Sequence, residues 1–288
     1  MTGHLDTASR LAPVTGLAAE PGIGRIDLTW QARRPYRPLV DHFAVHAARQ
    51  RHFRPTADTL VGKTIDTHLR HDNLGPQGST WYYQVVTVDA AGRASDPAGP
   101  LRATSRESVT VSGTPIAVVG DFDRKGLELA LSPDGYADYR TIFPGGADYT
   151  HGTDTPGAAW PYLHPGPADR WAGSTDHTFR LRFTLADAPP RDLALAIWLI
   201  DTHASIPGVL EIRCNDTAVT EVALENGATK GSLQGDATAP DSPLKPSIVE
   251  LPLPAATLRS GENVLTLHKG EGSWHAYDAL GVFRPRLP

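Results

Sequence analysis

The chain has 288 residues, with 27 lysines and arginines against 32 aspartates and glutamates, which gives a net charge of −5. It has no basic run of the kind that binds nucleic acid, and no stretch approaches the roughly 20 apolar residues of a membrane helix. The single cysteine, Cys214, excludes an internal disulfide and a cysteine-based metal site. This length suits two domains of roughly 100–200 residues each.

The first part of the chain has the two-residue period of β-strands. Ile26, Leu28 and Trp30 alternate with polar residues. Residues 42–47 alternate in the same way, and residues 81–88 combine aromatic with β-branched residues. Because no helical period lies between these strands, we predict a β-sandwich over residues 13–104.

Three stretches of this part, residues 13–17, 26–30 and 81–95, resemble bacterial fibronectin type III domains. The resemblance implies a spacer domain. Trp30 and Trp81 both lie in alternating strands, so we expect them to be core residues. A Pro/Gly stretch at 96–100 and polar residues after it place the boundary near residues 103–112. The second domain then spans residues 113–288.

The second domain is also all-β in pattern. Phe179, Leu181, Phe183 and Leu185 alternate with polar residues, whereas residues 193–200 are apolar on both faces and read as a doubly buried strand. Further strands are predicted at 209–214, 218–224, 248–253, 263–268 and 277–283. Two loops, 143–173 and 225–247, exceed the roughly 12–15 residues beyond which loops in compact domains are often functional.

The loop at 160–173 has the composition of a sugar-binding surface. It holds three aromatic residues, a histidine, an aspartate and an arginine. Aromatic faces stack on the C–H surfaces of sugars, and charged side chains bind hydroxyl or uronate groups. The same aromatics would instead fix the loop to the sandwich if they faced inward. We predict carbohydrate contacts from Trp160, Tyr162, His164, Asp169, Arg170 and Trp171.

Two other segments are expected to meet this loop. Residues 201–205 follow the doubly buried strand, and residues 272–278 precede the last strand. Polar residues at strand ends carry binding in sandwiches because the scaffold holds them rigidly. We add His177, His203, Trp274 and His275 to the predicted carbohydrate-binding set.

The second domain resembles the C-terminal jelly-roll domain of rhamnogalacturonan lyases and related polysaccharide lyase proteins. The matching stretches are residues 119–123, 160–173, 177–183, 258–267 and 272–280. In that family a catalytic domain precedes a fibronectin-like domain and this jelly roll. The resemblance implies a secreted protein that binds a plant or microbial polysaccharide, and Arg170 and the histidines favour an acidic one. It also implies a partner, either an N-terminal catalytic domain or a separate enzyme, since nothing here matches the catalytic domain.

Four carboxylates predict a structural calcium site. Asp121, Asp123 and Glu128 lie near the start of the second domain and Asp278 near its end, and first and last strands are often neighbours in such sandwiches. Oxygen ligands suit Ca²⁺. The alternative is that these are solvated surface carboxylates.

Two other functions stay open. The second domain could be a lyase, with His164 or His203 as base, Tyr162 as acid and Arg170 on the substrate carboxylate, or a hydrolase using Asp169 and Asp201. The chain could also be a structural or adhesion protein in which both sandwiches act as spacers.

Overall fold

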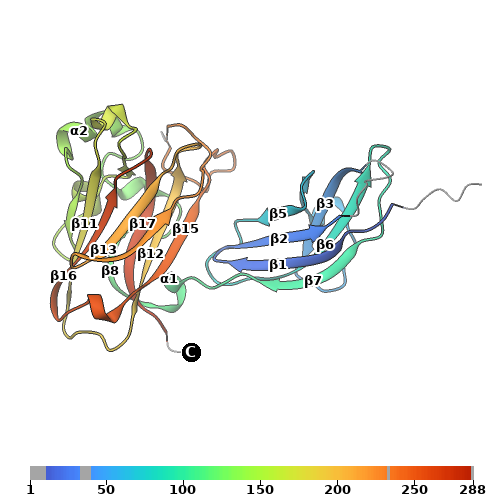
Figure 1. Cartoon of the computed structure of the whole chain (residues 1–288), viewed down its shortest axis with the longest axis horizontal. Helices are drawn as coiled ribbons and strands as arrows, with labels where there is room; N and C mark the ends of the chain where they lie inside the picture. Colours follow the sequence, from blue (N-terminus) through green and yellow to red (C-terminus); the bar gives the residue numbers. More distant parts are fainter. Residues whose placement is uncertain (1–10, 33–39, 232–233, 287–288) are drawn as a thin grey trace, which may run out of the picture. The chain divides into compact units, whose positions relative to one another are not determined.

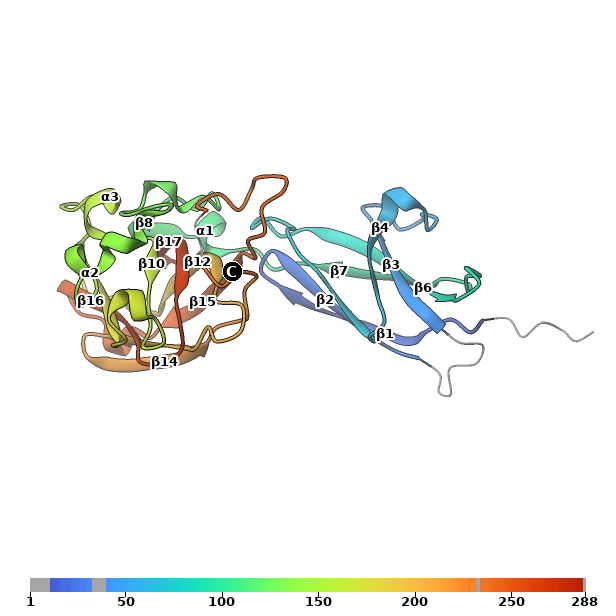
Figure 2. The ribbon, with the colours of Figure 1, turned by 90° about the horizontal axis from the view of Figure 1, so that it is seen from above.

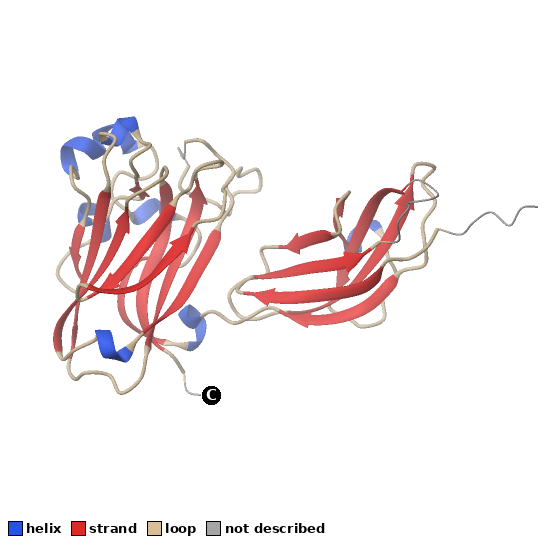
Figure 3. Cartoon of the chain, viewed as in Figure 1, coloured by secondary structure: helices blue, strands red, loops and turns tan. Residues whose placement is uncertain are grey.

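The computed structural model describes residues 11–32, 40–231 and 234–286. The fold is all-β, as predicted, with only short helices (Figure 3). The chain divides into two compact units, residues 1–111 and 112–288, within which the predicted domains 13–104 and 113–288 fall. Residues 1–10, in which the sequence shows no signal-peptide pattern, lie outside the described residues. Among those that are described, no helix is long and apolar enough to cross a membrane.

Unit 1 is a sandwich of a three-stranded and a four-stranded sheet (Figure 1). The first sheet has the order β1-β2-β5 and the second β4-β3-β6-β7. The strands are β1 (Thr15–Gly22), β2 (Arg25–Gln31), β3 (Val40–Ala48), β4 (Leu60–Thr64), β5 (His68–His71), β6 (Thr80–Asp89) and β7 (Ala98–Thr104), with a 3-10 helix at Ala57–Thr59.

The core of unit 1 follows from the strand period. Ile26, Leu28 and Trp30 point inward from β2, and the Trp30 ring meets Phe43 of β3 edge-on at 5.7 Å between centroids. Trp30 is therefore a core residue, as predicted. Trp81 is only half-buried, and the Arg49 guanidinium lies 3.8 Å from its ring centroid in a cation–π contact.

Unit 2 is a second sandwich of two five-stranded sheets (Figures 1 and 2). One sheet has the order β10-β17-β12-β15, with β8 also paired to β17, and the other has the order β14-β13-β16-β11-β9. The strands are β8 (Thr114–Gly120), β9 (Asp148–Thr150), β10 (Leu163–His164), β11 (His177–Leu185), β12 (Leu193–Thr202), β13 (Val209–Cys214), β14 (Thr217–Ala223), β15 (Ser247–Leu253), β16 (Gly261–Lys269) and β17 (His275–Arg284).

Short helical turns occupy the connections. α1 (Val109–Ser112) precedes β8, whereas α2 (Tyr139–Ile142) and α3 (Pro156–Ala159) belong to the long connection before β11. Single 3-10 turns lie at Gly126–Glu128, Gly135–Asp138, Arg170–Ala172 and Ala255–Thr257. The predicted loop 143–173 therefore contains β9, α3 and β10 as short elements.

Strand β12 is buried on both faces, as its sequence predicts. One face joins the core between the sheets, where Ile197 and Leu199 pack. The other face carries Trp198, which is covered by Phe122 at 5.4 Å between ring centroids. The segment after β8 thus closes the back of this sheet, so a continuous apolar strand has no face in water.

The pairing of β11 with β16 decides which side chains enter the core. Phe179 lies opposite Leu267, and Leu181 lies opposite Leu265, with these side chains buried. Positions between them, such as Arg180 opposite Thr266, face outward. Since the period of a strand is two, Lys269 falls in register with Leu265 and Leu267 and is carried inward.

Several aromatics predicted to contact sugar belong to the core instead. Trp160, Tyr162 and Trp274 are at most 2% exposed, so they have no face on which a sugar could stack. The Trp160 ring packs edge-on against Phe179 and Tyr277 at 5.1 and 5.5 Å between centroids. The loop composition is that of an anchored loop, because burying large aromatics compensates for the cost of ordering a long connection.

Replacing Trp160 with Ala is expected to lower the free energy of unfolding of unit 2 by about 3–5 kcal/mol, through lost burial and the cavity left behind. Trp171→Ala, at a half-buried position in the same loop, is the matched control and is expected to cost clearly less. Urea denaturation followed by fluorescence measures both. Equal, small losses for the two variants would contradict a core role for Trp160.

Candidate functional site

The three segments predicted to converge do meet at one end of unit 2. Leu163 of β10 pairs with Ala276 of β17, and the backbone N–H of His203 donates to the carbonyl of Trp274 at 3.1 Å. The Ala168 N–H donates to the carbonyl of Gly272 at 3.0 Å. Backbone hydrogen bonds, together with side-chain contacts such as that of Ser273 with Asp169, hold these segments together.

Most of the predicted histidines lie inside this junction. His164 stacks on Phe179 at 3.8 Å between ring centroids, with Nδ1 2.9 Å from the Tyr277 hydroxyl. His177 and His275 are also fully buried, and His275 has no hydrogen-bond partner for either ring nitrogen. Burial lowers the pKa of all three, so they are neutral. Their predicted role in sugar contact is not compatible with this burial.

The two carboxylates of the enzymatic alternative, Asp169 and Asp201, are engaged in hydrogen bonds within the protein. Asp169 accepts the Gly166 N–H at 2.9 Å and the Ser273 hydroxyl at 2.6 Å. Asp201 is fully buried and accepts the Ala228 N–H and the Thr229 hydroxyl. These carboxylates fix loops, and together with the buried His164 and Tyr162 they have no access to an external substrate.

Three predicted residues keep exposed surface. Arg170 is exposed, and Trp171 and His203 are half-buried. The Trp171 ring meets Tyr136 edge-on at 5.8 Å between centroids, which gives the loop an aromatic edge that reaches solvent. His203 Nδ1 accepts the N–H groups of Ser205 and Ile206 at 3.3 and 3.2 Å, which leaves Nε2 as its outward nitrogen.

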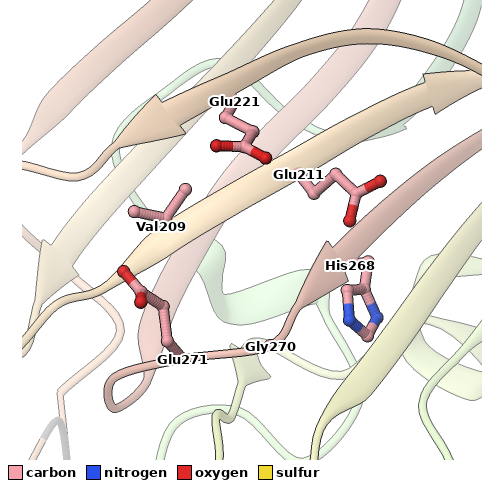
Figure 4. A pocket seen from close by; sticks show the side chains of 6 residues that line it. All are labelled: Val209, Glu211, Glu221, His268, Gly270 and Glu271. Atoms are coloured by element: carbon pink, nitrogen blue, oxygen red, sulfur yellow. The ribbon is translucent and has the colours of Figure 1, made fainter.

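A groove that the sequence analysis missed lies at this same end of the sandwich. It has a volume of about 250 Å³, and its residues come from β13, β14, the end of β16 and the segment after it (Figure 4). Glu211 is paired with both Glu221 and His268 across neighbouring strands. The lining consists of Val209, Glu211, Glu221, His268, Gly270 and Glu271.

The groove is polar and negatively charged. Glu211 forms an ion pair with Arg213 at 2.9 Å, whereas no ion pair to Glu221 or Glu271 is found in the described part of the chain. His268 lies 3.0 Å from the Thr178 hydroxyl through Nδ1, and its Nε2 is 3.7 Å from the Asp176 carboxylate. Carboxylates accept hydrogen bonds only, so the groove suits a ligand rich in hydroxyl or amino donors.

The residue after His268 in β16 is Lys269, whose side chain points to the opposite face of the sheet and is buried. Its ammonium donates to the carbonyl of Pro207, which anchors the segment before β13. Burial lowers the pKa of Lys269 to about 7, although Asp169 and Glu271 act in the opposite direction.

The predicted calcium ligands gather where β8 pairs with β17. The Lys125 N–H donates to Asp278 Oδ1 and to Asp123 Oδ1, each at 2.8 Å, and the Asp121 N–H donates to Glu128 Oε1 at 2.7 Å. Burial raises the pKa of Asp278 to about 7, and the nearby charges of Asp123 and Glu128 add to the rise. Asp278 Oδ2 is buried without a partner.

Gly120 is required at this junction. A Cβ there would lie 2.6 Å from the carbonyl oxygen of Asp278 and 2.8 Å from Glu128 Oε1, and the backbone φ is +78°. The carbonyl oxygen of Asp278 and Glu128 Oε1 therefore both lie beside Gly120. Even so, no group of three or more His, Cys, Asp or Glu side chains among the described residues is arranged to hold a metal ion.

No family model matches the sequence. No curated protein matches it either. Among solved structures, a human fourth fibronectin type III domain is 11% identical over 38% of this chain and 92% of its own, with a TM-score of 0.30. A family 35 carbohydrate-binding module from an environmental isolate is 13% identical over 40% of this chain and 73% of its own, with a TM-score of 0.26.

An α-L-rhamnosidase from Dictyoglumus thermophilum is 12% identical and covers 96% of this chain, with a TM-score of 0.29. This chain covers 29% of that enzyme. The chain thus has a coarse likeness to fibronectin type III domains, a carbohydrate-binding module and a glycosidase. The finer resemblance to rhamnogalacturonan lyases stays a prediction.

Lys269 is expected to make stability rise with pH. In the unfolded chain it keeps its proton up to its ordinary pKa of 10.5, whereas the folded protein releases that proton above about 7. The free energy of unfolding should therefore increase between pH 7 and 9.5, by up to about 1.4 kcal/mol for each pH unit.

Lys269→Met should flatten this increase, and Lys230→Met, at an exposed position of unit 2, should leave it unchanged. Urea denaturation at pH 6.5, 8.0 and 9.5 measures the slope for each protein. If Lys269→Met keeps the slope of the unaltered chain, Lys269 does not carry the effect.

Proposed function

We propose that unit 2 binds carbohydrate at the groove formed by Glu211, Glu221, His268 and Glu271, without itself cleaving it. The observation that carries the proposal is the placement of three carboxylates and a histidine around one cavity, with Glu211, Glu221 and His268 on paired strands and Glu271 in the segment after β16. The paired strands hold Glu211, Glu221 and His268 at fixed spacings, so several hydroxyl groups of one sugar ring can be bound together with little further ordering cost.

The charge of the groove narrows the ligand class. A uronate carboxylate would be repelled by Glu221 and Glu271, whereas a neutral or amino sugar supplies the donors that these groups accept. The proposed ligand is therefore a neutral or amino-substituted part of a glycan. This differs from the acidic polysaccharide inferred from Arg170 and the histidines, most of which are buried.

The aromatic edge of Trp171 and Tyr136 supports a contact beyond the groove. Residues 170–176 lead directly into β11, and Asp176 of this segment faces His268. A chain longer than one sugar could extend from the groove toward this edge, where the half-buried Trp171 and the exposed Tyr136 offer aromatic surface. In this proposal unit 1 is the spacer, and the chain acts outside the cell beside a polysaccharide-degrading enzyme.

Retardation in gels that contain neutral glucans, galactans, chitosan or pectic polymers tests the proposal. We expect retardation by a neutral or amino glycan, and at least tenfold weaker binding for Glu221→Gln combined with Glu271→Gln, because two acceptors are weakened. Asp187→Asn, at an exposed carboxylate outside the groove, is the control and should bind normally.

Binding that is unaffected by the double substitution would place the ligand elsewhere. Release of unsaturated uronates or of reducing ends in the same incubations would favour the enzymatic alternative over a binding module. No retardation by any polymer in the panel would favour the spacer alternative.

We also propose that Asp278 and Glu128, with the carbonyl of Asp278, bind a calcium ion. The unpartnered Oδ2 of the buried Asp278 supports this, because a buried carboxylate oxygen without a donor is costly and a cation would satisfy it.

Calcium at 5 mM is expected to raise the melting temperature by several degrees relative to protein dialysed against EDTA, since it binds the folded state only. Asp278→Asn should abolish this shift, and Asp187→Asn should retain it. A melting temperature that does not respond to calcium would instead indicate that Asp278 is protonated and that no ion is bound.

A further inference from the structure

A second pocket lies at the opposite end of the unit 2 sandwich from the acidic groove. The groove adjoins the first residue of β11, whereas the second pocket is formed by the loop after β11 and by the last residues of β17. Its volume is about 380 Å³. Three prolines, Pro189, Pro190 and Pro285, and three arginines, Arg191, Arg284 and Arg286, form most of its wall.

The walls are apolar and stiff. Each proline ring fixes its own backbone φ, so the loop before β12 and the segment after β17 have few alternative conformations. Leu193, the first residue of β12, is buried and also lines the pocket. A cavity with rigid apolar walls binds a flat apolar group at little cost in conformational entropy.

Most of the charged side chains around the pocket are arginines without an ion-pair partner among the described residues. Arg191, Arg284 and Arg286 are exposed, and none of them forms an ion pair with a described residue. The single acidic side chain in the lining, Asp192, accepts the backbone N–H of Ala255 at 2.9 Å and so caps a turn. A cluster of three guanidinium groups against one carboxylate is notable in a chain whose net charge is −5.

We propose that this pocket binds a small organic anion, in which a carboxylate or phosphate group is joined to a flat apolar body. Guanidinium groups bind the oxygens of such acids through paired N–H donors, and they also stack on flat rings. The prolines and Leu193 then cover the apolar body. The proposal does not depend on the carbohydrate site, which has the opposite charge and lies at the other end of β11.

Calorimetric titration of the full chain with 2-naphthoate tests this inference. We expect saturable binding that weakens at least tenfold for the neutral 2-naphthalenemethanol, because the charge-assisted hydrogen bonds are lost. Acetate, which has the charge without the apolar body, should also bind at least tenfold more weakly. Naphthyl phosphate in a parallel titration distinguishes a carboxylate from a phosphate site.

The variant Arg284→Gln combined with Arg191→Gln should weaken 2-naphthoate binding at least tenfold, whereas Arg102→Gln, at an exposed position of unit 1, should leave it unchanged. Thermal melts establish that all three proteins are folded. Raising the salt from 0.05 to 0.5 M should weaken binding to the unaltered chain. Equal affinity for the acid and the alcohol, insensitivity to the double substitution, or no binding of either anion at 10 mM would overturn the proposal.

Discussion

The two-residue period of the β-strands, locked by the register between β11 and β16, is the constraint on which unit 2 depends. With Phe179 opposite Leu267 and Leu181 opposite Leu265, every second side chain of both strands is committed to the core. A shift of one residue would exchange the inner and outer faces of the whole sheet. The same register puts Lys269 into the interior, where its ammonium holds the carbonyl of Pro207, and puts His268 outside, in the acidic groove. One buried lysine and one surface site thus arise from adjacent positions of a single strand.

Polar groups inside this end of the sandwich act as connectors between loops. Asp169 joins the 160–173 loop to Ser273, and Asp201 ties the end of β12 to residues 228 and 229. Each buried carboxylate accepts hydrogen bonds from backbone N–H groups of loops. Without it, these N–H groups would have no partner. The loops on this side are therefore held by core aromatics and by buried acids together. A binding surface at their edge gains rigidity from residues that themselves never contact a ligand.

The sequence was sufficient to predict the strands and to place Trp30 in the core, because a local alternation of apolar and polar residues reports directly on burial. It was insufficient for the 160–173 loop, since a loop has no period and its composition does not tell whether Trp160 faces inward or outward. The groove was missed for a different reason. Glu211, Glu221 and His268 are ordinary outward residues of their own strands. The hairpin of β13 and β14 sets Glu211 opposite Glu221, but only the pairing of β13 with the distant strand β16 brings His268 beside them.

The two ends of unit 2 carry side chains of opposite charge. At the first end, Glu221 and Glu271 form no ion pair with a described residue, so an approaching anion is repelled and donors are favoured. At the other end, three arginines face a single carboxylate that is already engaged with the backbone of Ala255. The chain's modest net charge does not reveal this separation, because the negative charges at one end and the positive charges at the other largely cancel. The two proposed sites would therefore select ligands of opposite charge at opposite ends of the same sandwich, and neither site can be inferred from composition alone.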